Sequence, residues 1–232
     1  SASEFMSHWR ELWHVALPAL GTQLLVPGAQ LITTVLVAPF GSAAVAGFGV
    51  ATRVEMVSSL PVLALSISMM PFVAQNLGGK KLARIQRAAR IAAGVSLIWG
   101  VLVYLLLFGL GVPIADAFSD DSQVHVVVVS YFMLVIIALG AGGVQNICSS
   151  VLNALRCPWP ALLLNIGRHL LVAAPLGWAL SWSMGYEGVF VALFLSALVF
   201  GLASWFVCVA KQRSVGEGLA AGGAGALAGP LR

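Results

Sequence analysis

The chain has 232 residues, of which 60% are hydrophobic and only 9% are charged. So little polar surface cannot cover a water-soluble globule, and lipid must therefore be the solvent for most of the chain. The formal net charge of +4 does not indicate a nucleic-acid-binding protein, because the basic residues lie beside hydrophobic segments rather than on a face of their own.

Six hydrophobic runs, separated by Gly, Pro and charged residues, are each long enough for a transmembrane helix. They cover about residues 14–38, 43–77, 91–111, 124–155, 161–184 and 189–210. They are too long and too uniformly apolar for the short alternating strands of a membrane barrel. We predict an all-α membrane protein with six transmembrane helices in residues 12–211. A cytoplasmic lead, 1–11, which could be a cloning or fragment remnant, precedes them, and a flexible Gly/Ala-rich cytoplasmic tail, 212–232, follows.

The first run offers polar side chains for a cavity wall. Gln23 and Gln30 are seven residues apart and so share one face of a helix, with Thr34 one turn further on. Hydrogen bonds to neighbouring helices are an equally good explanation for each of these side chains.

The second run contains two prolines, Pro61 and Pro71, each of which removes a backbone hydrogen bond and permits a bend. Both are candidates for a hinge, and Met69 is a candidate for the surface of a substrate cavity. Arg53 and Glu55, two residues apart, point to different helix faces and cannot pair with each other. We expect them to bond neighbouring helices near the outer mouth.

Basic residues concentrate at alternate connections. Connections on one side hold Arg10, then Lys80, Lys81, Arg84, Arg87 and Arg90, then Arg156, and finally Lys211 and Arg213, whereas those on the other side hold Asp116, Asp120, Asp121 and Glu187. Because basic loops stay in the cytoplasm, we predict cytoplasmic termini and a multi-pass protein of the plasma (bacterial inner) membrane. The run 80–90 is predicted to be a solvated connection beside anionic lipid.

The fourth and fifth runs carry further polar candidates for the cavity: Gln145 and Asn146, and then Asn165, Arg168 and Trp178. An unpaired charge within the hydrocarbon costs roughly 2.5 to 3.5 kcal/mol, so Arg168 should face a wet cavity or cap free carbonyls of a neighbouring helix. For His169 a packed, hydrogen-bonded position is favoured.

Signatures of enzymes and metal sites are absent from the sequence. It contains no HExxH, GxSxG or Walker motif and no paired carboxylates within a span. Cys148, Cys157 and Cys208 lie in or beside apolar runs without disulfide or metal-binding spacing, so we interpret them as reduced, packed thiols. We predict that the protein is not an enzyme and has no cofactor, no metal ligand and no catalytic residue.

Residues 49–88 resemble the multidrug and toxic compound extrusion (MATE) transporters, in which a long helix carries an Arg and a Glu near its outer end, a central proline, and a QNxG motif before a basic loop. Here Gln75 and Asn76 begin QNLGG. LPALGTQLL from Leu17, VAPFGSAAVAGFGVATR ending at Arg53, and VQNICSSVLNALRCPWPAL from Val144 resemble other family segments.

The resemblance implies one lobe of a twelve-helix transporter, the C-terminal six-helix lobe, with Gln75 and Asn76 as further hinge or gate candidates. The chain would then be a fragment or a half-size subunit, and its partner would be a second six-helix lobe. Val26 and Gly142 stand where sodium-coupled members carry carboxylates. The resemblance therefore implies coupling through the other lobe, to H+ in preference to Na+.

The function that follows is cation-coupled antiport of amphipathic organic cations or toxins by alternating access. Two alternatives remain open. A lobe of a flippase for lipid-linked substrates would need a more basic cavity, and a non-transporting interaction subunit or truncated relic would only pack against another membrane protein.

Overall fold

The structure is a computed structural model that describes residue 21 and residues 24–220, and this part of the chain is helical almost throughout. A helix over residues 24–37 leads into η1 (Ala38–Phe40), and α2 (Ser42–Gly78), α3 (Leu82–Phe118) and α4 (Ser122–Leu134) follow. Then come η2 (Ile136–Ala138), α5 (Leu139–Ala154), α6 (Pro158–Ile166), η3 (Gly167–Ala173), α7 (Ala174–Met184) and α8 (Tyr186–Ala220).

Five of the described helices are long and apolar enough to cross a membrane. They are Ser42–Gly78, Leu82–Phe118, Ser122–Ala154, Pro158–Met184 and Tyr186–Gly218. The predicted first span is represented by the shorter apolar helix Leu24–Phe40, and most of its earlier residues lie outside the described part. The predicted all-α membrane fold is confirmed.

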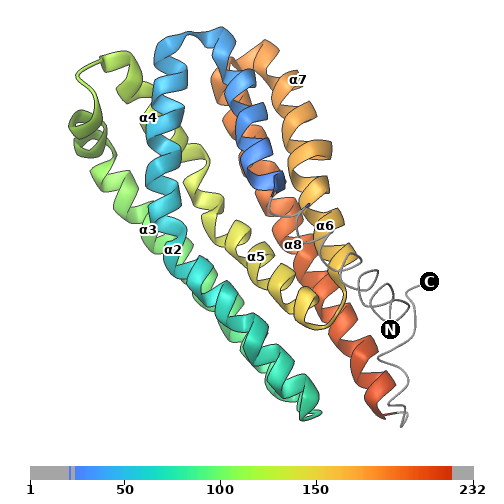
Figure 1. Cartoon of the computed structure of the whole chain (residues 1–232). Coiled ribbons are helices and arrows are strands. Elements are labelled where there is room, and N and C mark those ends of the chain that lie inside the picture. Colours follow the sequence, from blue (N-terminus) through green and yellow to red (C-terminus); the bar gives the residue numbers. More distant parts are fainter. Residues whose placement is uncertain (1–20, 22–23, 221–232) are drawn as a thin grey trace, which may run out of the picture.

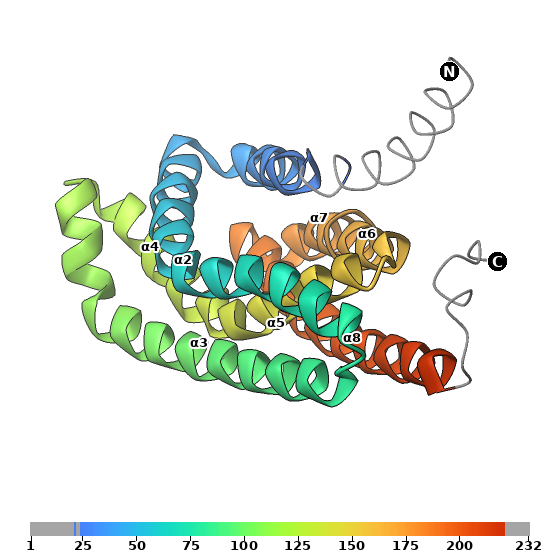
Figure 2. The same cartoon turned by 60° about the horizontal axis from the view of Figure 1, so that its bottom comes forward.

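Helix α5 lies in the middle of the lobe and contacts α2, α3, α6 and α8, as Figures 1 and 2 show from two directions. The lobe has one apolar cluster toward each end. One cluster centres on Phe48, Tyr131 and Phe190, and the other includes Met69 and Ile147. Large apolar side chains on the outside stay exposed, as expected where lipid is the solvent.

Small residues let α5 approach its neighbours closely. A Cβ added to Gly100 of α3 would lie 2.5 Å from the backbone nitrogen of Gly140, and one added to Gly201 of α8 would lie 2.7 Å from the carbonyl oxygen of Ala141. The Ser96 hydroxyl donates to the Gly140 carbonyl at 3.0 Å. Close backbone approach and interhelical hydrogen bonding are the main means of holding helices together in lipid.

Two of the long helices are interrupted. A 3-10 turn, η2, separates α4 from α5, and a π-helical segment, η3, separates α6 from α7. Pro175 follows η3 closely and removes one backbone donor there. Such π-helical segments often occur at functional sites.

The connections are shorter than the sequence suggested, which corrects two boundaries. Helix α3 begins at Leu82, so residues 82–90 are helical turns, with Ile85 and Ala89 buried and the arginines exposed, and not part of a connection. Helix α8 continues to Ala220, into the predicted flexible tail, and Gln212 is 2% exposed within it. We call the end with Asp120, Asp121 and Glu187 the acidic end, drawn at the top of Figure 1, and the opposite end the basic end.

Candidate functional site

A carboxylate on α2 bonds a tyrosine on α4. The Tyr131 hydroxyl donates to Oε2 of Glu55. The Tyr131 side chain is 2% exposed, and its ring packs edge-on against Phe48 and Phe190, with centroids 5.9 and 5.0 Å away. Glu55 is half-buried, so its carboxylate is held by a rigid partner while part of the side chain remains accessible.

A second chain of polar contacts starts from Arg168 on η3. Its Nη1 donates to Oε1 of Gln145 at 3.1 Å. The Gln145 amide donates in turn to Oδ1 of Asn165 at 3.4 Å, and the Asn165 amide donates to Oγ of Ser149 at 3.3 Å and to the Ala161 carbonyl at 2.8 Å. Gln145 and Asn165 are buried, so hydrogen bonds satisfy groups that would be costly to leave unpaired in hydrocarbon.

The Arg168 guanidinium lies against a glycine. A Cβ on Gly142 would stand 3.2 Å from Nη1 and 3.4 Å from Nη2. A larger side chain at this position would displace the guanidinium from Gln145. Gly142 therefore makes room for the bond between Arg168 and Gln145.

These two sets of contacts are separate, since among the described residues no hydrogen bond or ion pair joins Glu55 or Tyr131 to Arg168 or Gln145. We define the polar network as Glu55, Tyr131, Gln145, Ser149, Asn165 and Arg168. Its members come from α2, α4, α5, α6 and η3, with Tyr131 and Gln145 on the two sides of η2, Asn165 just before η3 and Arg168 within it. A conformational change at either interruption would alter the separation of the two charges.

Hydrogen bonds join three residues predicted from sequence, Gln145, Asn165 and Arg168, while a fourth, Glu55, bonds Tyr131. Glu55 bonds a neighbouring helix, as expected of it, and Arg53 is exposed on another face of α2. Within the described residues Arg168 bonds a side-chain amide and not the helix carbonyls offered as one alternative.

Other predicted site residues lie outside this network, and their assignment to a substrate cavity stays a prediction. Met69 is 4% exposed within an apolar cluster, and Asn146 points away from the network and is exposed. Gln30 is exposed, and the Thr34 hydroxyl bonds its carbonyl. Trp178 is 58% exposed and packs edge-on against Trp182. Gln23 lies outside the described residues.

The hinge candidates lie along α2, which runs unbroken through both Pro61 and Pro71. Both prolines are on its exposed face. Asn76 is buried near the end of the helix, where its amide donates to the Phe72 carbonyl and its own carbonyl accepts from Lys81, whereas Gln75 is exposed. Gln75 and Asn76 thus lie where α2 ends, next to the turn into α3.

Sequence reasoning missed Tyr131 and Ser149. A tyrosine in the middle of a valine-rich span was an available signal, because a buried Tyr hydroxyl needs a partner. Ser149 offered no comparable signal, since small hydroxyl residues are common in membrane helices.

Comparison with known proteins places this arrangement in a family. The family model described as MatE matches residues 18–179. The chain belongs to the MatE family. The crystal structure of the Vibrio cholerae MATE transporter VcmN in its bent form has a TM-score of 0.85 and 30% identity, over 90% of this chain and 48% of that one.

Curated relatives of the MatE chain agree. A FAD transporter of Shewanella oneidensis is 34% identical over 87% of this chain and 44% of its own length. A probable multidrug resistance protein NorM of Pseudomonas syringae pv. tomato is 26% identical over 83% of this chain and 44% of its own length. The chain therefore spans about half the length of these relatives, as expected of one lobe.

The polar network consists of charged and hydrogen-bonding side chains. Members of the MatE family are membrane transporters. No group of three or more His, Cys, Asp or Glu side chains in the described part could hold a metal ion. What the network offers is a carboxylate on the unbroken helix α2, and a guanidinium and two amides on helices that are interrupted.

Proposed function

We propose that this chain is one lobe of a cation-coupled antiporter that exports amphipathic organic cations by alternating access. It would pair with a second six-helix lobe, the chain itself being the C-terminal one, in a bacterial inner membrane with cytoplasmic termini. Relatives named multidrug resistance protein NorM and multidrug export protein MepA support export as the direction of transport.

The observation that carries this proposal is the polar network, in which Glu55 on the continuous helix α2 lies opposite charged and amide side chains on interrupted helices. Placing charges within the hydrocarbon is costly, and a packed lobe gains little by keeping an acid and a base there unless they are used. Helix interruptions at substrate and ion sites are a recurring feature of secondary transporters. An organic cation that approaches Glu55 would compete with Arg168 for the carboxylate.

We propose that proton coupling acts in this lobe too, through the same carboxylate, in addition to the coupling through the other lobe that the resemblance implies. A proton on Glu55 removes the negative charge that attracts Arg168, and a Glu55 that is protonated no longer needs the Tyr131 hydroxyl as a donor. The balance between two arrangements of η2 and η3 would then depend on protonation, as alternating access requires. Because Val26 and Gly142 offer no carboxylate, a sodium site in this lobe is disfavoured.

A second candidate function is the export of a flavin dinucleotide. The Shewanella relative is named a FAD transporter, and Arg168, Gln145 and Asn165 together offer donors of the kind that bind phosphate. A lipid-linked diphosphate would also use them, but the polar network contains a single arginine, which is little for a flippase.

The test is transport by cells or vesicles that contain this chain together with the lobe that complements it. Ethidium efflux is measured under separate proton and sodium gradients, and flavin release to the medium is measured in the same strains. Glu55→Gln should reduce proton-driven ethidium efflux by about tenfold or more, the coupling expected of a charge used in the transport cycle.

Matched controls are available in α8, where Glu217 and Arg213 are exposed. Glu217→Gln and Arg213→Gln make the same chemical changes away from the network and should leave efflux intact. Normal efflux by both Glu55→Gln and Arg168→Gln would contradict the proposal. Flavin release that depends on Arg168 while ethidium is not moved would establish the second candidate instead.

A further inference from the structure

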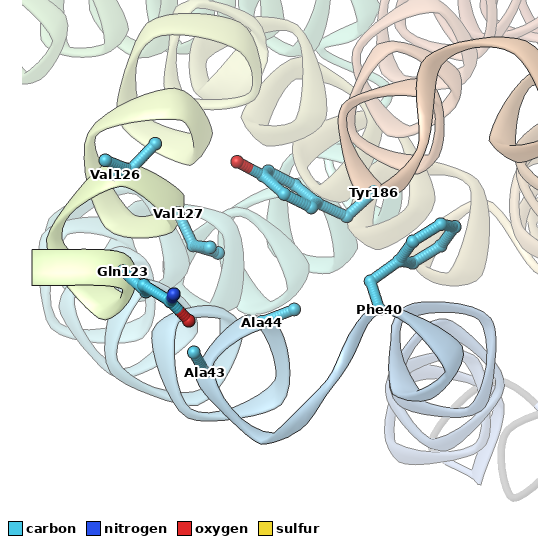
Figure 3. A pocket seen from close by; sticks show the side chains of 7 residues that line it. All are labelled: Phe40, Ala43, Ala44, Gln123, Val126, Val127 and Tyr186. Carbon is cyan, nitrogen blue, oxygen red and sulfur yellow. The ribbon is translucent and has the colours of Figure 1, made fainter. Parts of the chain in front are cut away.

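A separate hollow lies at the acidic end of the lobe, away from the polar network. It has a volume of about 250 Å³. Figure 3 shows the aromatic side chains of Phe40 and Tyr186 together on one side and three α4 side chains, Gln123, Val126 and Val127, on the other, with alanines from the start of α2 between them. The hollow therefore combines aromatic and aliphatic walls with one neutral polar group.

The two aromatic rings form a pair. Phe40 and Tyr186 meet edge to face with their centroids 6.3 Å apart. Phe40 is 38% exposed, and both side chains line the hollow. An aromatic face attracts a cation that comes within about 6 Å of it, and more strongly where water is excluded.

A carboxylate lies next in the chain to a residue that lines this hollow. Glu187 directly follows Tyr186, and its Oε1 accepts from the Ser130 hydroxyl at 3.3 Å. Ser130 is one helical turn along α4 from Val126 and Val127, which line the hollow. The Glu187 carboxylate is thus bonded by a neutral donor that lies one helical turn along α4 from two lining residues.

The charges around the hollow favour a cation. The connections at the acidic end, 39–41, 119–121 and 185–187, contain Asp120, Asp121 and Glu187 and no lysine or arginine. Asp121 accepts from the Gln123 backbone and caps α4, which fixes the first turn of the hollow's wall. His125 lies nearby with its Nδ1 3.1 Å from Asp116, so it faces a carboxylate and not the hollow.

We propose that this hollow is a binding site for a compact quaternary ammonium ion, with Phe40 and Tyr186 as the aromatic wall and Glu187 as the counter-charge. Aromatic rings beside a single carboxylate suit a cation that carries methyl groups in place of N–H donors, because such an ion needs dispersion and charge but no hydrogen bonds.

An aromatic cluster joins this site to the polar network. The ring centroids of Tyr186 and Phe190 are 5.7 Å apart, and those of Phe190 and Tyr131 are 5.0 Å apart. Tyr131 bonds Glu55 and is adjacent to Ser130, which bonds Glu187. The site goes beyond the proposed function, since it lies within one lobe and needs no transport to be occupied.

The test is direct binding to the full chain in lipid nanodiscs, measured by isothermal titration calorimetry. The probes are choline and its neutral isostere 3,3-dimethylbutan-1-ol, which has the same shape without the charge. Choline should bind at least about tenfold more tightly than the alcohol, since the site supplies both an aromatic wall and a carboxylate.

Glu187→Gln is the decisive variant, because its side-chain oxygen still accepts from Ser130 and the fold is kept. It should weaken choline binding by about tenfold and leave the alcohol unchanged, and Tyr186→Leu, which keeps apolar volume, should weaken choline by about fivefold. Glu217→Gln, the same change at an exposed position of α8, should have no effect. Equal affinities for choline and the alcohol, no choline binding, or insensitivity to Glu187→Gln would each overturn the proposal. None of these results depends on ethidium efflux.

Discussion

The close contact between α3 and α5 makes a sharp prediction for Gly100→Ala. The added methyl would lie 2.5 Å from the nitrogen and 2.6 Å from the Cα of Gly140. Both obstacles are backbone atoms, which cannot rotate away as the end of a side chain can. We therefore expect a cost at the upper part of the range for overpacked cores, about 3 kcal/mol. Helix α5 would move outward and weaken the bond from Ser96 to the Gly140 carbonyl.

The same helix offers two matched controls. A methyl on Gly94 or Gly109 of α3 would meet nothing within 4 Å, so Ala there should be neutral or stabilise the helix by up to about 1 kcal/mol. Thermal unfolding of the purified chain in detergent measures the difference. Gly100→Ala should lower Tm by about 6 to 12 °C for a domain of this size. A Tm equal to those of the two controls would refute the packing described for α3 and α5.

Three other variants and reagents test the structure. Tyr131→Phe removes the hydroxyl that bonds Glu55 and should lower the free energy of unfolding by about 1 kcal/mol. Tyr104→Phe is the control, and equal Tm values for the two variants would show that the bond adds no stability. The Ser204 hydroxyl is buried without a hydrogen-bond partner among the described residues, so Ser204→Ala should leave Tm unchanged or raise it, and a lower Tm would count against that assignment. All three cysteines are buried: Cys148, Cys157 and Cys208. Mass spectrometry should therefore detect maleimide labelling only after denaturation, and rapid labelling of the folded chain would contradict their buried positions.

Hydrophobicity made the fold class predictable. A run of 20 or so apolar residues can satisfy its backbone in lipid only as a helix, and this rule located the spans. It placed the ends less well, because a membrane helix can extend into water. Residues 82–90 continue α3 with their charged side chains outward and Ile85 and Ala89 buried, a helical pattern hidden within the charged run.

The candidate site was predicted in part. The free-energy cost of placing a charge in the hydrocarbon indicated Glu55 and Arg168 as site candidates without knowledge of their orientation. The same reasoning could not separate Gln145, which is 1% exposed, from its neighbour Asn146, which is exposed. Their residue types are equivalent, and only the rotation of α5 against α6 and η3 decides which amide faces inward.

The sequence by itself determined the solvent, the helical class, the alternation of charge between the two ends and the membership of a transporter family. These depend on composition and on order along the chain. Tertiary structure alone decided that Tyr131 bonds Glu55, that Gly142 leaves room for Arg168, and that Phe40, Gln123 and Tyr186 enclose one hollow. Each of these contacts joins residues far apart in the chain. Side chains that cost nearly the same free energy to place in lipid differ in their partners only once particular helices pack together.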